Sequence, residues 1–107
     1  VRLTNNGGAG GDRIQIWNAA NSAQLPLGTV SLRNTGYVTT SRNFTGSTMQ
    51  LVGSVVVVTL GTPSGATLTV ATPTNATWAP SATVFDPAGN TATTTSVTES
   101  GVADVQF

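Results

Sequence analysis

The sequence predicts an all-β domain, an antiparallel β-sandwich of about seven to nine strands, on three observations. Apolar and polar residues alternate with the period of two that strands show, and the 3.6-residue period of a helix does not dominate any segment. Clusters of Gly, Pro, Asn and Ser recur at the short spacing of an all-β fold. Thr and Ser, about a quarter of the residues, suit the outer faces of strands. The 107 residues fit a single domain, 1–107, with one core that needs no disulfide.

The first half of the chain contains most of the candidate strands. A short strand is expected at residues 1–5, before the glycine-rich segment 6–11. That segment is expected to be a flexible turn, because no Lys-Ser/Thr pair follows it as in a phosphate-binding loop. Residues 12–18 alternate, so Ile14 and Ile16 face one side and Trp17 the polar side. Further strands are expected at residues 29–33, 37–40 and 48–52.

The four consecutive valines at 55–58 give the strongest strand signal in the chain. Because both faces of such a strand are apolar, it is expected to lie centrally and to be covered on both sides. Residues 66–70 alternate again, and Pro73 and Pro80 bracket an expected loop that carries Trp78. The inward positions of these segments form the expected core: Ile14, Ile16, Val30, Leu32, Val56, Val58, Leu68, Val70 and Val84.

Residues 81–95 contain the most specific local motif, the turn Asp86-Pro87-Ala88-Gly89-Asn90. Asp86 can accept backbone hydrogen bonds, Pro87 presets φ, and Gly89 can take the left-handed conformation that closes a hairpin. With this turn and the Thr-rich alternation after it, the chain resembles the bacterial immunoglobulin-like modules (Big or HYR type) of surface proteins and adhesins. The resemblance implies an immunoglobulin-like sandwich and a secreted, extracellular role at a cell surface. The chain shows no internal repeat, which favours a single-domain subunit over a tandem array.

The charged side chains are few, and their chemical types limit the functions that the chain can have. Four arginines and four carboxylates give a net charge of zero, and the chain has no His, Cys or Lys. Because no group titrates near pH 7 and no base can activate a Ser or Thr, we expect no enzyme activity, no cofactor and no metal. The carboxylates of Asp12, Asp86, Glu99 and Asp104 are expected to act in turns and caps. Neutrality argues against nucleic acid, and no apolar stretch of about 20 residues predicts a membrane span.

Three aromatic residues and two asparagines are candidate binding or modification sites. Trp17, Tyr37 and Trp78 carry rings of the kind that stack on sugars, so a carbohydrate-binding accessory module is one alternative; for Trp78 a cap on the core is the simpler interpretation. Asn43 and Asn75 begin Asn-x-Thr patterns, which predict surface loops carrying N-linked glycans. Chance matching remains the open alternative for both, because the chain is rich in Asn and Thr.

Both ends of the chain are apolar and alternate, at positions where most domains fray. The candidate assembly residues are Val1, Leu3, Val102, Val105 and Phe107. The ends either close the sandwich within one molecule or complete a neighbour's sheet and propagate a filament. We therefore expect a structural or adhesive subunit of a cell-surface appendage or filament, partnered by itself or by another cell-surface protein. A polysaccharide-binding module and a virion structural protein are the alternatives.

Overall fold

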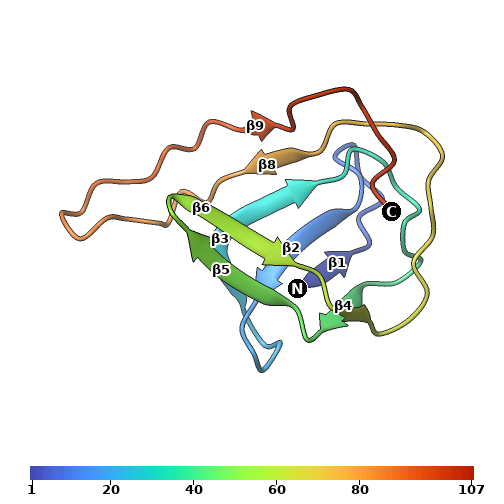
Figure 1. The fold of residues 1–107 in the computed structure, drawn as a ribbon, viewed down its shortest axis with the longest axis horizontal. Coiled ribbons are helices and arrows are strands. Elements are labelled where there is room, and N and C mark those ends of the chain that lie inside the picture. The colour runs from blue at the N-terminus through green and yellow to red at the C-terminus, as the bar shows by residue number, and fades with distance from the viewer.

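The computed structural model describes all 107 residues and contains nine strands and no helix. The strands are β1 (Arg2–Thr4), β2 (Arg13–Trp17), β3 (Gln24–Ser31), β4 (Arg42–Thr45), β5 (Thr48–Val52), β6 (Val55–Thr59), β7 (Thr62–Pro63), β8 (Thr77–Ala79) and β9 (Val97–Thr98) (Figure 1). They form one sheet of seven strands and one of two, and every pairing is antiparallel. The predicted fold class, an all-β antiparallel sandwich, is confirmed.

The large sheet has the order β7-β4-β1-β2-β3-β8-β9, so the N-terminal strand lies in its interior. Successive pairings place Leu3 opposite Ile14, Ile14 opposite Val30, Val30 opposite Trp78, and Trp78 opposite Val97. Side chains of directly opposed residues point to the same face of a sheet. These five residues therefore form an apolar row across five strands, and this row defines the inner face of the sheet.

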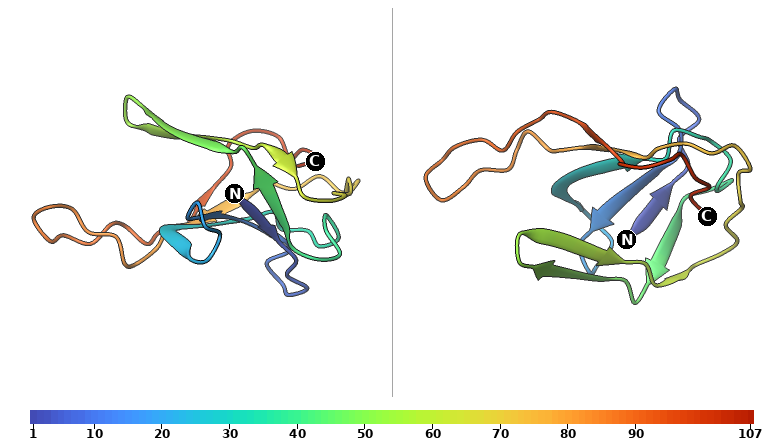
Figure 2. Two further views of the ribbon diagram at one scale, coloured as in Figure 1. Left: turned by 90° about the horizontal axis from the view of Figure 1, so that it is seen from below. Right: turned by 45° about the horizontal axis from the view of Figure 1, so that its top comes forward.

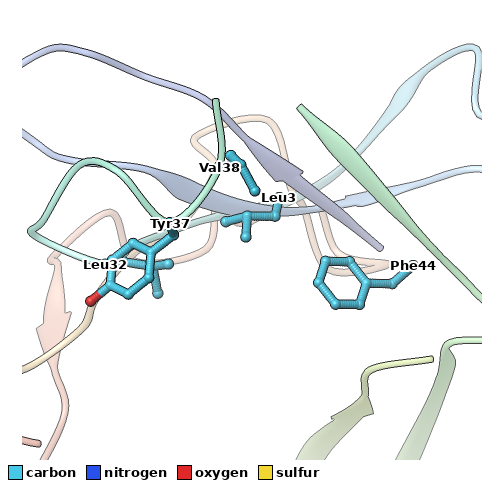
Figure 3. Close-up of a cluster of buried hydrophobic side chains, with 5 residues drawn as sticks. All are labelled: Leu3, Leu32, Tyr37, Val38 and Phe44. Carbon is cyan, nitrogen blue, oxygen red and sulfur yellow. The ribbon is translucent and has the colours of Figure 1, made fainter. Parts of the chain in front are cut away.

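A small core covers one end of the inner face (Figure 3). Its buried side chains are Leu3, Leu32, Tyr37, Val38 and Phe44. Phe107 closes this cluster from the C-terminus, with its ring centroid 5.7 Å from that of Tyr37 and 6.3 Å from that of Phe44. Only seven of the 107 residues are buried, so most of the apolar side chains lie outside the core.

Strands β5 and β6 form a hairpin that projects from the rest of the molecule (Figures 1 and 2). Gly53, with φ 61°, occupies the first position of the two-residue turn, as a type II′ turn requires. Neither strand contacts a strand of the large sheet, and every residue from 48 to 60 is exposed. The valine run forms a strand as predicted, but the prediction of a covered, central strand is wrong because no other strand packs on it.

Four other predicted segments differ from the structure. Residues 37–40 and 66–70 are irregular, and the strand expected at 29–33 begins earlier, at Gln24, and ends at Ser31. Trp78 lies in β8 rather than in a loop.

The nine residues of the expected core fall into three groups. Leu32 is buried, five residues are half-buried and three residues are exposed. The half-buried residues are Ile14, Ile16, Val30, Val70 and Val84, and the exposed ones are Val56, Val58 and Leu68.

Residues 80–96 form a second projection, an extended arm that folds back at the predicted turn (Figure 1). Gly89 has φ 87° and donates its amide to the Asp86 carbonyl at 2.9 Å, while the Asp86 amide donates to the Asn90 carbonyl at 3.0 Å. Phe85 and Thr91 form the one bridge next to the turn. The predicted turn and the positive φ of Gly89 are confirmed, although the flanking residues do not form a continuous ladder.

Candidate interaction surfaces

The structure does not bring the three candidate aromatic rings together. Tyr37 is fully buried in the core, so its ring is not presented at the surface. Trp78 belongs to the apolar row on the inner face and is 42% exposed. Its indole Nε1 donates to the Leu27 carbonyl at 3.0 Å, which fixes the ring against β3, the neighbouring strand of the sheet. The Trp17 indole contacts Arg2 and Gln15, which oppose each other in the sheet, so the ring lies on the polar side that the alternation predicts.

Trp17 borders a hollow of about 320 Å³ between the turn that follows β2 and the end of β4. Asn18, Asn21 and Asn43 line this hollow together with the apolar residues Val1, Ala19 and Phe44, and no charged side chain does so. The Arg2 guanidinium carbon lies 4.6 Å from the centroid of the Trp17 ring, a cation–π contact that holds the indole in place. Amide groups beside a fixed aromatic ring suit a neutral, polar ligand better than a charged one.

The two candidate glycosylation sites lie in ordered surroundings rather than in free loops. Asn43 is a residue of β4, and its side-chain Oδ1 is buried without a hydrogen-bond partner. The Nδ2 of Asn75 donates to the Glu99 carbonyl at 3.2 Å and to the Gly101 carbonyl at 3.3 Å. A glycan on Asn75 would replace one of the hydrogens that make these two bonds.

The candidate assembly residues at the termini divide into two groups. Val1 and Leu3 pack at the core from the interior of the large sheet, and Phe107 packs on the core rings, so these three lie within their own molecule. Val102 is 94% exposed and Val105 is 41% exposed.

The carboxylates act in turns and in side-chain hydrogen bonds. Asn90 donates from its side chain and from its backbone to Asp86, and these bonds, in that order, hold the pKa of the Asp86 carboxyl below its ordinary value of 3.8. Glu99 and Asp104 both accept hydrogen bonds from Nε2 of Gln106, at 3.3 and 2.5 Å, so the fold brings together two acids that are separated in the sequence. No cluster of three or more potential metal-ligating acids, histidines or cysteines is present.

Asp12 has a structural role that is more specific than the turn role expected from the sequence. Its carboxyl group is fully buried and accepts backbone hydrogen bonds from Asn6 at 3.0 Å, Tyr37 at 3.0 Å and Val38 at 3.3 Å. The glycine-rich turn is therefore held against the core rather than left flexible.

Seven of the fourteen large apolar side chains that are exposed lie on the β5–β6 hairpin, whereas the assembly residues expected from the sequence lie at the termini. Met49, Leu51, Val52 and all four valines of β6 are exposed there. The signal in the sequence is the absence of any charged residue between Arg42 and Asp86, combined with the valine run. A charge-free, β-branched segment that nothing in its own molecule covers is a candidate interaction surface.

No protein-family model, curated protein or solved structure matches this chain. The structure also contains no helix with the length and hydropathy needed to cross a membrane. The function is therefore inferred from the surface and the side-chain chemistry.

Proposed function

We propose that this protein is a non-enzymatic, extracellular subunit or module of a cell-surface appendage or filament, related to the bacterial immunoglobulin-like modules. The observation that carries the proposal is the large apolar surface that the molecule leaves uncovered, concentrated on the β5–β6 hairpin. A secreted subunit that is completed by its neighbours has this kind of surface, because association supplies the missing burial.

Two measures of compactness support the proposal. A compact monomer of 10.8 kDa exposes about 5,500 Å², whereas this chain exposes 6512 Å². The radius of gyration is 14.2 Å, against about 13 Å for a compact chain of this length. The excess surface arises from the two projecting segments, which are available for contacts with a partner.

The proposal of a non-enzymatic role rests on the chemistry of the side chains. The chain has no His, Cys or Lys to act as a base, a nucleophile or a metal ligand. The Asp12 carboxyl is buried under backbone amides, and Asp86 is occupied by its own turn. Neither group is free to exchange a proton with a substrate.

Sedimentation and electron microscopy of the purified chain test the proposed function. We expect oligomers or fibres whose mass increases with concentration, because apolar surface without charge associates. A chain that stays monomeric at high micromolar concentration and shows no particles larger than the monomer would contradict the proposal.

One observation favours a second candidate function, binding of a neutral polysaccharide: the uncharged hollow beside Trp17, which three asparagines and several apolar residues line. Stacking on an indole and hydrogen bonding to amides are the usual ways in which proteins bind sugars. A monomer that is retained on an insoluble polysaccharide, with retention lost in Trp17→Ala, would support this second function over the first.

A further inference from the structure

The β5–β6 hairpin lacks the packing that a two-stranded sheet needs. Its strands pair in register from Thr48 opposite Thr59 to Val52 opposite Val55, and they contact no other strand. A hairpin of two strands is marginally stable in water by itself, and three or more strands with an apolar face are needed for independent stability. The hairpin therefore gains stability from any further strand that joins it.

The outer edge of β6 carries none of the features with which proteins protect a free edge. It has no Lys, no charged residue and no proline, and its pairing with β5 has no bulge. Natural edge strands are usually blocked by these features, because an unblocked edge pairs with other chains. Val55, Val56 and Val57 are 60%, 55% and 43% exposed, so both faces of this edge strand are also apolar.

We propose that β6 pairs antiparallel with β6 of a second copy of this chain, around a two-fold axis near Val57, to form a continuous four-stranded sheet in the order β5-β6-β6-β5. This interface rests on the proposed function and names the partner in the assembly and the strand that binds it. Because a two-fold contact closes on itself, it forms a dimer, and a filament needs a second contact elsewhere on the molecule. Val57 is the central residue of β6, so an antiparallel pairing of the strand with itself places two copies of Val57 side by side.

The surface area and the charge identify the occupant of this edge as a second copy. The two projecting segments together expose roughly 1,000 Å² more than a compact monomer of this size has, and a standard interface buries about 800 Å² on each partner, so the hairpin supplies part of such an interface. Residues 43–85 carry no charge, so two identical hairpins meet without repulsion between like charges. A charged partner would find no complementary group on this segment.

A cysteine substitution in the middle of β6 tests the geometry directly. The chain has no cysteine, so after Val57→Cys any disulfide must join two copies at this position. The matched control is Val102→Cys, because Val102 is 94% exposed and lies outside the hairpin. Under mild oxidation we expect most V57C chains to become covalent dimers and V102C chains to remain monomers. Equal cross-linking of the two variants, or none in V57C, would overturn the proposed pairing.

A charge substitution at the same position tests the energetics. Val57→Lys adds the charge that protected edges carry, so we expect a folded monomer, while Val102→Lys associates like the original chain. Circular dichroism and the urea midpoint check the fold, and the cysteine pair provides the test if V57K does not fold. If the original chain is monomeric, both the proposed function and this interface fail. If it assembles and V57K assembles equally, the interface alone is wrong, and the hairpin is then covered by its own molecule or by another surface of the neighbour.

Discussion

Among single residues, Asp12 connects the largest number of separate segments. Its carboxyl accepts amides from the glycine-rich turn and from residues 37 and 38, while its own amide donates to the Asn34 carbonyl at 2.7 Å and its carbonyl accepts from Leu32 at 2.9 Å. No cation takes part in this network of hydrogen bonds. A buried acid thus holds the irregular segment 34–38 in place, and this segment includes the first two residues of the strand predicted at 37–40.

We predict that Asp12→Asn lowers the free energy of unfolding by about 2–4 kcal/mol, because one carboxyl oxygen becomes an NH₂ group that faces buried N–H donors. The matched control is Asp104→Asn, the same chemical change at an exposed residue, which should cost less than about 0.5 kcal/mol. Urea unfolding followed by tryptophan fluorescence measures both values. Equal midpoints for the two variants would show that the three amides find other acceptors.

Among the elements, the arm at residues 80–96 is ordered mainly by the hydrogen bonds of its turn. The Asp86 carboxyl accepts hydrogen bonds from the Asn90 side chain, the Asn90 amide and the Ala88 amide, each at 2.9 Å. These bonds require the ionised form, which is why the pKa of Asp86 lies below its ordinary value. The group therefore stabilises the turn above pH 3.8, and this stabilisation is lost as the pH falls through the lowered pKa.

We predict that the turn opens in acid while the rest of the molecule stays folded, since the arm is exposed and lies apart from the core. Between pH 6 and pH 2, the amides of Ala88 and Asn90 should lose protection in NMR hydrogen-exchange spectra only below about pH 4. In Asp86→Asn the same amides should respond to acid much less. Protection in the original chain that stays constant down to pH 2 would argue against the role of the carboxylate.

The same elements show how far the local sequence determines this fold. Strands β1, β2, β5 and β6 and the Asp86 turn could be predicted, because alternation, β-branching and turn residues act locally. The segment 37–40 could not, because Tyr37 and Val38 are both buried in succession and give their amides to Asp12, whereas a strand would alternate them and pair them with a neighbour. The position of Trp17 on the polar face could be predicted; the burial of Tyr37 depends on long-range packing.

For the whole molecule, the main fact that the sequence does not reveal is what covers the valine run. Local pattern identifies β6 as apolar on both faces, but it cannot say whether its cover comes from the same chain. In the structure, Val1, Leu3 and Phe107 pack at the core of their own molecule, whereas no other strand packs on the hairpin. Self-association is therefore expected at the middle of the chain, and the ends act to complete the monomer.

The ring of Phe107 distinguishes apolar surface that stabilises the monomer from apolar surface that joins subunits. Phe107 packs edge-on against Tyr37 and beside Phe44, so Phe107→Ala should lower the free energy of unfolding by about 2 kcal/mol, less than for a fully buried ring. Val102→Ala, a change at the most exposed valine of the tail, should change it by less than about 0.5 kcal/mol. The urea midpoints of both variants measure their stability, and sedimentation measures their assembly. Under conditions in which both variants are folded, they should assemble like the original chain. If F107A instead kept its midpoint and lost assembly, the tail would belong to a neighbouring molecule, and the ends rather than the hairpin would join the subunits.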